Sequence, residues 1–198
     1  AYSAEAGVLS PAGGDALAVL GYIDQGGNHI IRGSLDAGSF DQFALGDGMI
    51  GSSLEDAFGN EVNGSWGSTP GSLGASFQKF KAYASANGVD PNSVYAGESY
   101  DAAALLILAM QAGDCDISGC NGSTDGRSIA DNIQKIANGS GPKIYAGELA
   151  KGLRLLSAGN SINYQGATDV NFTEVGEAFG QFLEKGYVDG KFVNVGAR

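Results

Sequence analysis

Hydrophobic residues near the start of the chain form two short apolar runs with an amphipathic segment between them. Residues 16–20 form the first run and residues 43–45 form the second. Between these runs, Ile30, Ile31 and Leu35 are spaced so that they share one face of a helix. The pattern predicts a strand, a helix and a second strand in that order.

Each of the two predicted strands is followed by a side chain that could bind a ligand. Tyr22 follows the first strand and Asp47 follows the second. In such units the ends of the strands face a crevice in which ligands bind. An aromatic ring beside a carboxylate suits a small molecule with a cationic amine and an apolar body. Two alternatives stay open, because Asp is also common as a turn cap before glycine and Tyr as a packing residue at a strand end.

Helical patterns recur through the middle of the chain. Ser52 and Glu55 have the spacing of a capping box that opens a helix ending at Phe58. The segment 99–113 is apolar nearly all round, which predicts burial against other elements, and it carries Asp101 in its first turn. Three further segments have a helical stripe of apolar residues: 77–86, 127–137 and 147–158.

Short strands are predicted on either side of these helices. Residues 62–69 form an extended, small-residue-rich segment that we interpret as a strand leading to a crossover between lobes. After residue 161 the period changes, which predicts strands at 162–164, 170–172 and 179–183. Asp189–Gly190 lies between two apolar pairs in 187–193, the pattern of a β-hairpin.

Composition narrows the class of protein. The chain has 198 residues, enough for one large or two small domains, and 43% of them are hydrophobic. The net charge of −11 argues against nucleic acid as a partner, because phosphate binding needs a basic surface. No apolar run approaches the roughly 20 residues that span a bilayer. The sequence begins with Ala1, so we expect either a removed leader or a piece of a longer protein.

The two cysteines, Cys115 and Cys120, are close enough in sequence to close a small disulfide loop. Paired cysteines indicate an oxidising compartment, although two reduced thiols remain the alternative. Zinc is disfavoured, since there is no second cysteine pair and no nearby histidine. The same loop partly matches a calcium-binding pattern, but it has Asn121 at the apolar position and Asp in place of the final Glu. The matching positions are Asp114, Asp116, Ser118, Gly119 and Asp125.

Catalytic patterns are weak, and we expect neither an enzyme nor a cofactor. The segment Gly97–Asp101 resembles a nucleophile elbow, but Asp101 stands where the close turn needs glycine. The single histidine, His29, lies on a predicted helix and would have to serve as the base of any hydrolytic triad. No phosphate-binding glycine motif follows a predicted strand.

Four stretches, in order, carry a resemblance to a known family: residues 21–38 with 46–49, residues 98–110, residues 125–141 with 144–159, and residues 162–178. Together they make the chain similar to the periplasmic solute-binding proteins of branched-chain amino acid ABC transporters. The resemblance implies an α/β chain with part of a type I periplasmic-binding-protein fold. Residues 1–69 would belong to the second lobe, 70–160 would be the helical return segment of the first lobe, and 161–198 would close the second lobe. The first half of the family pattern is absent, so we expect a C-terminal fragment.

The resemblance also implies roles for individual residues. The acid that binds the ligand ammonium falls on Asp47, although family members often have Glu there, and a flanking aromatic residue falls on Tyr22. A first-lobe aromatic residue falls on Tyr95. The ligand carboxylate would bind hydroxyl and N–H groups in the missing N-terminal half.

Two functions from different classes follow from the resemblance. The first is a periplasmic binding protein that delivers an amino acid or related solute to a membrane permease of an ABC transporter. The second is a ligand-sensing domain of the same fold, in signalling or amide regulation. An α/β hydrolase is disfavoured, because one histidine would have to serve every role.

Overall fold

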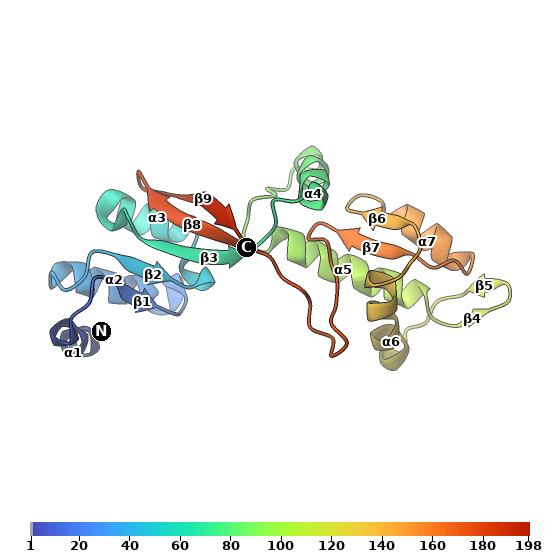
Figure 1. The fold of residues 1–198 in the computed structure, drawn as a ribbon, viewed down its shortest axis with the longest axis horizontal. Coiled ribbons are helices and arrows are strands. Elements are labelled where there is room, and N and C mark those ends of the chain that lie inside the picture. The colour runs from blue at the N-terminus through green and yellow to red at the C-terminus, as the bar shows by residue number, and fades with distance from the viewer. Residues whose placement is uncertain (1) are drawn as a thin grey trace. The chain divides into compact units, whose positions relative to one another are not determined.

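The computed structural model describes residues 2–198, which form two compact units. Unit 1 consists of Ala1–Pro70 and Phe182–Arg198, and unit 2 consists of Gly71–Gln181 (Figure 1). The boundary expected between residues 160 and 161 therefore lies at residue 181, and residues 161–181 belong with the helices of unit 2. The reason is that strand β7 (Asn163–Gly166) pairs in parallel with β6 (Lys143–Tyr145), which is also in unit 2.

Unit 1 is built on a five-stranded sheet with the order β1-β2-β3-β8-β9. The first three strands are parallel, whereas β8 and β9 are antiparallel to their neighbours. The strands are β1 (Leu17–Val19), β2 (Phe43–Leu45), β3 (Trp66–Pro70), β8 (Phe182–Val188) and β9 (Lys191–Ala197). The hairpin predicted at 187–193 is confirmed, and Asp189 and Gly190 form its turn with positive φ angles of 51° and 75°.

Short helices precede and connect the parallel strands of unit 1, and α2 and α3 pack against its sheet. The helices of unit 1 are α1 (Ser3–Leu9), η1 (Ser10–Ala12), η2 (Ile23–Gln25), α2 (Gly27–Asp36), η3 (Asp47–Met49), α3 (Ser52–Phe58) and η4 (Gly59–Val62). Ile31 of α2 and Leu54 of α3 are fully buried against Phe43 of β2, within one hydrophobic core. The strand–helix–strand unit predicted from the sequence is thus confirmed as β1, α2 and β2.

The predicted capping box at the start of α3 is wrong. The N-cap is Gly51 and no side chain caps the helix, because Ser52 is already the first helical residue. Glu55 instead accepts hydrogen bonds from the backbone N–H of Phe192 and from Lys191 Nζ, each at 2.9 Å. The carboxylate therefore links α3 to β9 rather than closing its own helix.

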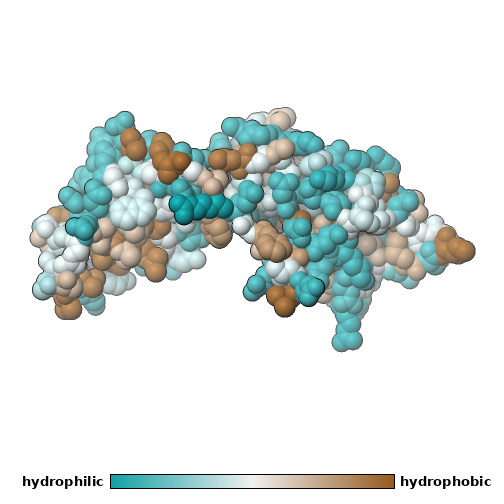
Figure 2. Space-filling view, viewed as in Figure 1, coloured by the Kyte–Doolittle hydropathy of each residue, from teal (hydrophilic) through white to brown (hydrophobic). Residues whose placement is uncertain are grey.

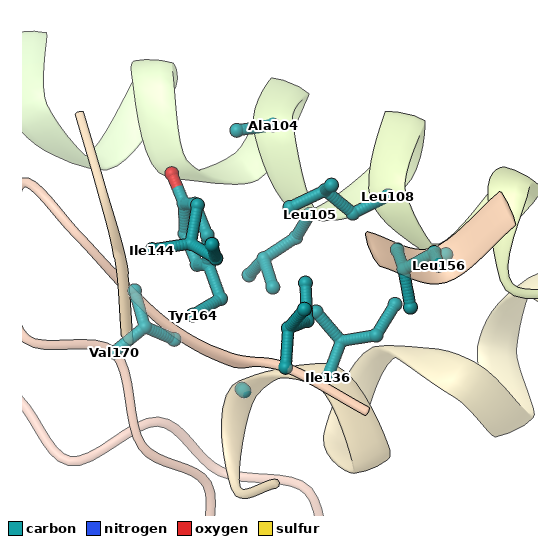
Figure 3. Packing of buried hydrophobic residues seen from close by; sticks show 11 residues of the cluster. Ala104, Leu105, Leu108, Ile136, Ile144, Leu156, Tyr164 and Val170 are labelled. Carbon is teal, nitrogen blue, oxygen red and sulfur yellow. The ribbon is translucent and has the colours of Figure 1, made fainter. Parts of the chain in front are cut away.

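Unit 2 is a group of helices with two small pairs of strands. Its helices are α4 (Ala75–Ala86), α5 (Ala96–Gln111), α6 (Gly126–Ala137) and α7 (Leu149–Ser157). Helix α5 packs against both α6 and α7. In Figure 3, Leu105 and Leu108 of α5 point toward Ile136 of α6 and Leu156 of α7, with Tyr164 and Val170 completing the core.

Only one face of α5 is buried, contrary to the all-round burial predicted from its composition. Asp101, Ala104, Leu105, Leu108 and Ala109 are buried. The opposite stripe is exposed, with Leu106 at 50%, Ile107 at 42% and Met110 at 38%. Ala102 and Ala103 extend this stripe toward the start of the helix. We call these five exposed residues the α5 stripe.

Asp101 does not act in the first turn of α5, because the helix begins at Ala96, earlier than predicted. Its carboxylate is buried and accepts four hydrogen bonds of 2.8–2.9 Å. The donors are the Tyr164 hydroxyl, the Ala167 and Thr168 backbone N–H groups, and the Thr168 hydroxyl. Figure 3 shows the Tyr164 hydroxyl directed toward α5. The carboxylate thereby fastens α5 to the segment that follows β7.

A disulfide joins Cys115 and Cys120, which confirms the predicted pairing. The two cysteines face each other across the short hairpin of β4 (Cys115–Asp116) and β5 (Gly119–Cys120). The Gln111 side-chain amide donates a hydrogen bond to the Cys120 carbonyl at 2.8 Å, which holds the hairpin against α5. Asp125 caps α6 by accepting from Ser128 N–H, and residues 2–198 contain no cluster of metal-ligating side chains.

Replacing both cysteines with serine should lower the free energy of unfolding by about 2 kcal/mol, the loop-closure entropy of so short a loop. Urea unfolding followed by circular dichroism measures the change. A reducing agent should cause the same loss in the wild-type chain and none in the double-serine variant. A loss that reductant produces equally in both proteins would show that the disulfide is not its source.

Candidate functional site

The carboxyl ends of β1 and β2 lie at the same edge of the sheet, because the two strands are parallel. Val19 pairs with Leu45, so the segments that follow, Gly21–Tyr22 and Asp47–Gly48, leave the sheet side by side. The backbone N–H of Gly46 donates to the Val19 carbonyl at 3.1 Å, which continues the pairing past the strands. The structure therefore brings the segments of Tyr22 and Asp47 together, as the strand pattern predicted.

Tyr22 presents its ring at this edge while its backbone is fixed. The side chain is 62% exposed. The Tyr22 carbonyl accepts hydrogen bonds from the N–H groups of Gln25 and Gly27, at 3.2 and 3.0 Å. The alternative interpretation, a packing residue at a strand end, stays open, because the ring also lies close to Gly48. The ring is available to contact a ligand.

Asp47 opens the 3-10 helix η3 and is partly buried. Its Oδ1 atom accepts a hydrogen bond from the Gly48 N–H at 2.9 Å. This is the bond that the turn-capping interpretation predicts, and it also fixes the carboxylate at the strand end. The two interpretations of Asp47 are therefore compatible.

Tyr95 lies in unit 2, at the N-cap of α5, whereas Tyr22 and Asp47 lie in unit 1. Its backbone has φ 64°, which is unusual for an aromatic residue, and its side chain is exposed. The Tyr95 carbonyl accepts a hydrogen bond from Ser99 N–H at 2.8 Å in the first turn of α5. A left-handed tyrosine at a helix start is a position where strain is often associated with function.

A cavity of about 460 Å³ lies beside Tyr22, between β1 and the helices α1 and α2. Sequence patterns did not indicate it. Its lining is mainly apolar and includes all of β1 and Leu20, which follows it, with Glu5 and Gln25 as charged and amide members. Tyr22 and Gly27 both line the cavity, so it adjoins the candidate site.

Residues that suggested other chemistry are placed away from any catalytic arrangement. Gly97–Asp101 lies inside α5 rather than on a strand-to-helix turn, so it is not a nucleophile elbow. His29 is exposed on α2. Within residues 2–198, none of the helices combines the length and apolar character needed to cross a bilayer.

Comparison with solved structures decides the fold. The chain matches the leucine-binding protein LivK of Thermotoga maritima with a TM-score of 0.67, and the match covers 100% of this chain. The chain has part of the type I periplasmic-binding-protein fold. It spans about half of that protein, 48% of its length, with 21% sequence identity. The neighbour is a binding protein and not an enzyme.

Sequence comparison gives a shorter match. The chain is 33% identical over 78 residues to the chemotactic signal transduction system substrate-binding protein BasB of Halobacterium salinarum. That match covers 39% of this chain and 17% of BasB. No protein-family model matches the chain.

Proposed function

We propose that the chain is the later part of an extracytoplasmic binding protein that holds an amino acid or a similar small solute between two lobes. The observation that carries this proposal is the pairing of an exposed aromatic ring and a fixed carboxylate at the strand ends of unit 1. Its support is that the fold is shared with a leucine-binding protein.

In this proposal the two ends of the solute meet different lobes. The ammonium group binds the Asp47 carboxylate, and the apolar side chain lies against the Tyr22 ring. Tyr95 contributes a second aromatic wall from the first lobe. The solute carboxylate binds polar groups of the N-terminal half of the protein.

The α5 stripe is one reason to propose that a further half of the protein packs against this chain. Leu106, Ile107 and Met110 are spaced as one helical face, opposite the face that packs on α6 and α7. A helix that is apolar on two faces is typical of one buried between two layers. We propose that an N-terminal half of the protein covers this stripe; LivK, of which this chain matches 48%, is long enough to include such a half.

The sheet of unit 1 gives a second, independent reason to propose a further half of the protein, because the described residues of unit 1 leave one of its faces uncovered. Register partners Ala18, Ala44 and Trp66 form a row on the face opposite the helical core, and the row continues through Gly186 to Val193. Trp66 and Val193 are exposed there. Figure 2 shows brown hydrophobic atoms at the surface of both units. Since parallel sheets are ordinarily covered on both faces, this row also fits a missing layer.

Delivery to the membrane permease of an ABC transporter, in the periplasm or its equivalent, is the role we propose first. A sensory role is the alternative, and the similarity to BasB favours it specifically. The two roles share the solute site and differ in the membrane partner. Deleting the gene should abolish solute uptake in the first case, and in the second it should abolish a behavioural response while uptake continues.

Replacing Asp47 with alanine in the two-lobed protein should weaken amino-acid binding by about 2 kcal/mol or more, through loss of the partner of the ammonium group. Thermal-shift screening against amino acids, amides and aromatic acids identifies the ligand, and calorimetry then measures its affinity. Asp41→Ala is the matched control, because Asp41 is exposed and precedes β2 at the opposite end of the same strand. Unchanged affinity in Asp47→Ala would remove this residue from the site.

The isolated chain offers a second check. Residues 1–198 should bind the same ligand weakly or not at all, because one wall of the proposed site is absent. Tight binding by these residues alone would contradict a site shared with an N-terminal half.

A further inference from the structure

Gly48 lets the backbone after β2 lie against the ring of Tyr22. A methyl group on Gly48 would lie 2.6 Å from Cδ1 and 2.9 Å from Cε1 of that ring, and 2.6 Å from the Gly21 carbonyl oxygen. Gly48 is not among the residues with positive φ, so its backbone is one that any residue adopts. The need for glycine here comes from the close approach of both the Tyr22 ring and the Gly21 carbonyl oxygen, and not from a positive φ angle.

A second glycine holds the backbone behind the ring. A methyl group on Gly27 would lie 2.3 Å from Met49 Sδ and 2.8 Å from the Tyr22 carbonyl oxygen. Met49 follows Gly48 and is fully buried in the core of unit 1. The Tyr22 carbonyl, Gly27 and Met49 are thus closely packed, which fixes the backbone that carries the ring.

We propose that Gly48 is a positioning residue of the solute site, which sets the place of the Tyr22 ring next to the Asp47 carboxylate. This proposal rests on the proposed function. A side chain at position 48 would overlap both the Tyr22 ring and the Gly21 carbonyl oxygen. The ring can turn about its side-chain torsions, whereas the carbonyl belongs to the backbone, so the ring is the group that would be displaced. The gap between ring and carboxylate would then no longer match the solute.

A double-mutant cycle in the two-lobed protein tests this role, with L-leucine as the probe in calorimetry. Gly48→Ala should weaken binding by about tenfold or more, whereas in a Tyr22→Ala background the same change should weaken it by less than about twofold. Gly33→Ala is the matched control: it is the same substitution in the same unit, at a position with open space around it, and it should leave affinity unchanged. Equal losses in both backgrounds would overturn the proposal.

A measurement without ligand separates this proposal from the proposed function. With 3-fluorotyrosine incorporated, the ¹⁹F resonance of Tyr22 is assigned by its disappearance in Tyr22→Phe. It should move in Gly48→Ala and stay in place in Gly33→Ala. An unmoved resonance in Gly48→Ala overturns the proposal, whether or not L-leucine binds. A moved resonance in a protein that binds no amino acid upholds the contact and contradicts the proposed function.

Folding of the single variant is checked by circular dichroism. If Gly48→Ala fails to fold, the Tyr22→Ala/Gly48→Ala double variant decides, because removing the ring relieves that overlap. Recovery of folding in the double variant supports the contact between residue 48 and the ring. Failure of both variants would place the strain at the Gly21 carbonyl and overturn the proposal.

Discussion

Replacing Asp101 with alanine is expected to lower the free energy of unfolding by about 3–5 kcal/mol, among the largest effects of a single substitution. The carboxylate is 3% exposed and accepts four hydrogen bonds. Its removal leaves the N–H groups of Ala167 and Thr168 and the Tyr164 hydroxyl without their acceptor in a buried place. Urea unfolding measures the loss. Asp131→Ala, at an exposed position of α6, is the control and should change stability by less than about 0.5 kcal/mol.

Asp101→Asn adds a test of charge. Burial raises the pKa of Asp101 above its ordinary value, against the opposing pull of the hydrogen bonds from Ala167, Thr168 and Tyr164. Because the folded state then holds the proton more tightly than the unfolded chain, this residue stabilises the fold most at low pH. Its contribution is lost as the pH rises through the folded-state pKa. The free energy of unfolding of Asp101→Asn should lack this pH-dependent contribution. If the free energy of unfolding varied with pH in the same way in both proteins, the raised pKa would not belong to Asp101.

Two leucines on opposite faces of α5 should respond very differently to the same substitution. Leu108 is fully buried among α6 and α7, so Leu108→Ala should cost about 3 kcal/mol through lost burial and the cavity left behind. Leu106 is 50% exposed, so Leu106→Ala in the 198-residue chain should cost less than about 0.5 kcal/mol. Unfolding of the two variants in parallel gives the comparison.

The same two leucine variants test whether the proposed N-terminal half covers the α5 stripe. In the two-lobed protein, the cost of Leu106→Ala should rise toward that of Leu108→Ala, because the α5 stripe is then covered. A cost that stays near zero in the longer protein would show that the stripe remains exposed there and would contradict the proposed layer.

Local patterns predicted most of the helices and strands, because each depends on residues near in sequence. The period of the apolar residues was sufficient for β1, α2 and β2, and Asp189–Gly190 was sufficient for the hairpin. Patterns failed where a partner is distant. Glu55 has the spacing of a capping box, but its carboxylate binds Lys191, 136 residues away. Asp101 was read as a first-turn acid, but Tyr164 and Thr168, more than 60 residues later, determine its role.

In the candidate site, too, local patterns predicted some features and missed those that depend on distant partners. Tyr22 and Asp47 could be predicted as neighbours because parallel strands end at one edge of a sheet, and their roles in binding stay predictions. The role proposed for Gly48 could not be predicted, since glycine is frequent in this chain and its close approach to Gly21 and Tyr22 is visible only in the structure. The exposed face of α5 also escaped the pattern, because composition alone does not tell which of two apolar faces has a partner.

The way that unit 2 interrupts unit 1 has a consequence for biosynthesis. Strand β3 must wait for β8, its neighbour in the sheet, until all of residues 71–181 have been translated. Unit 2 is continuous in sequence, whereas the earlier segment of unit 1 keeps an unpaired edge on β3 until β8 has been made. During that time the open edge of β3 could pair with a wrong strand.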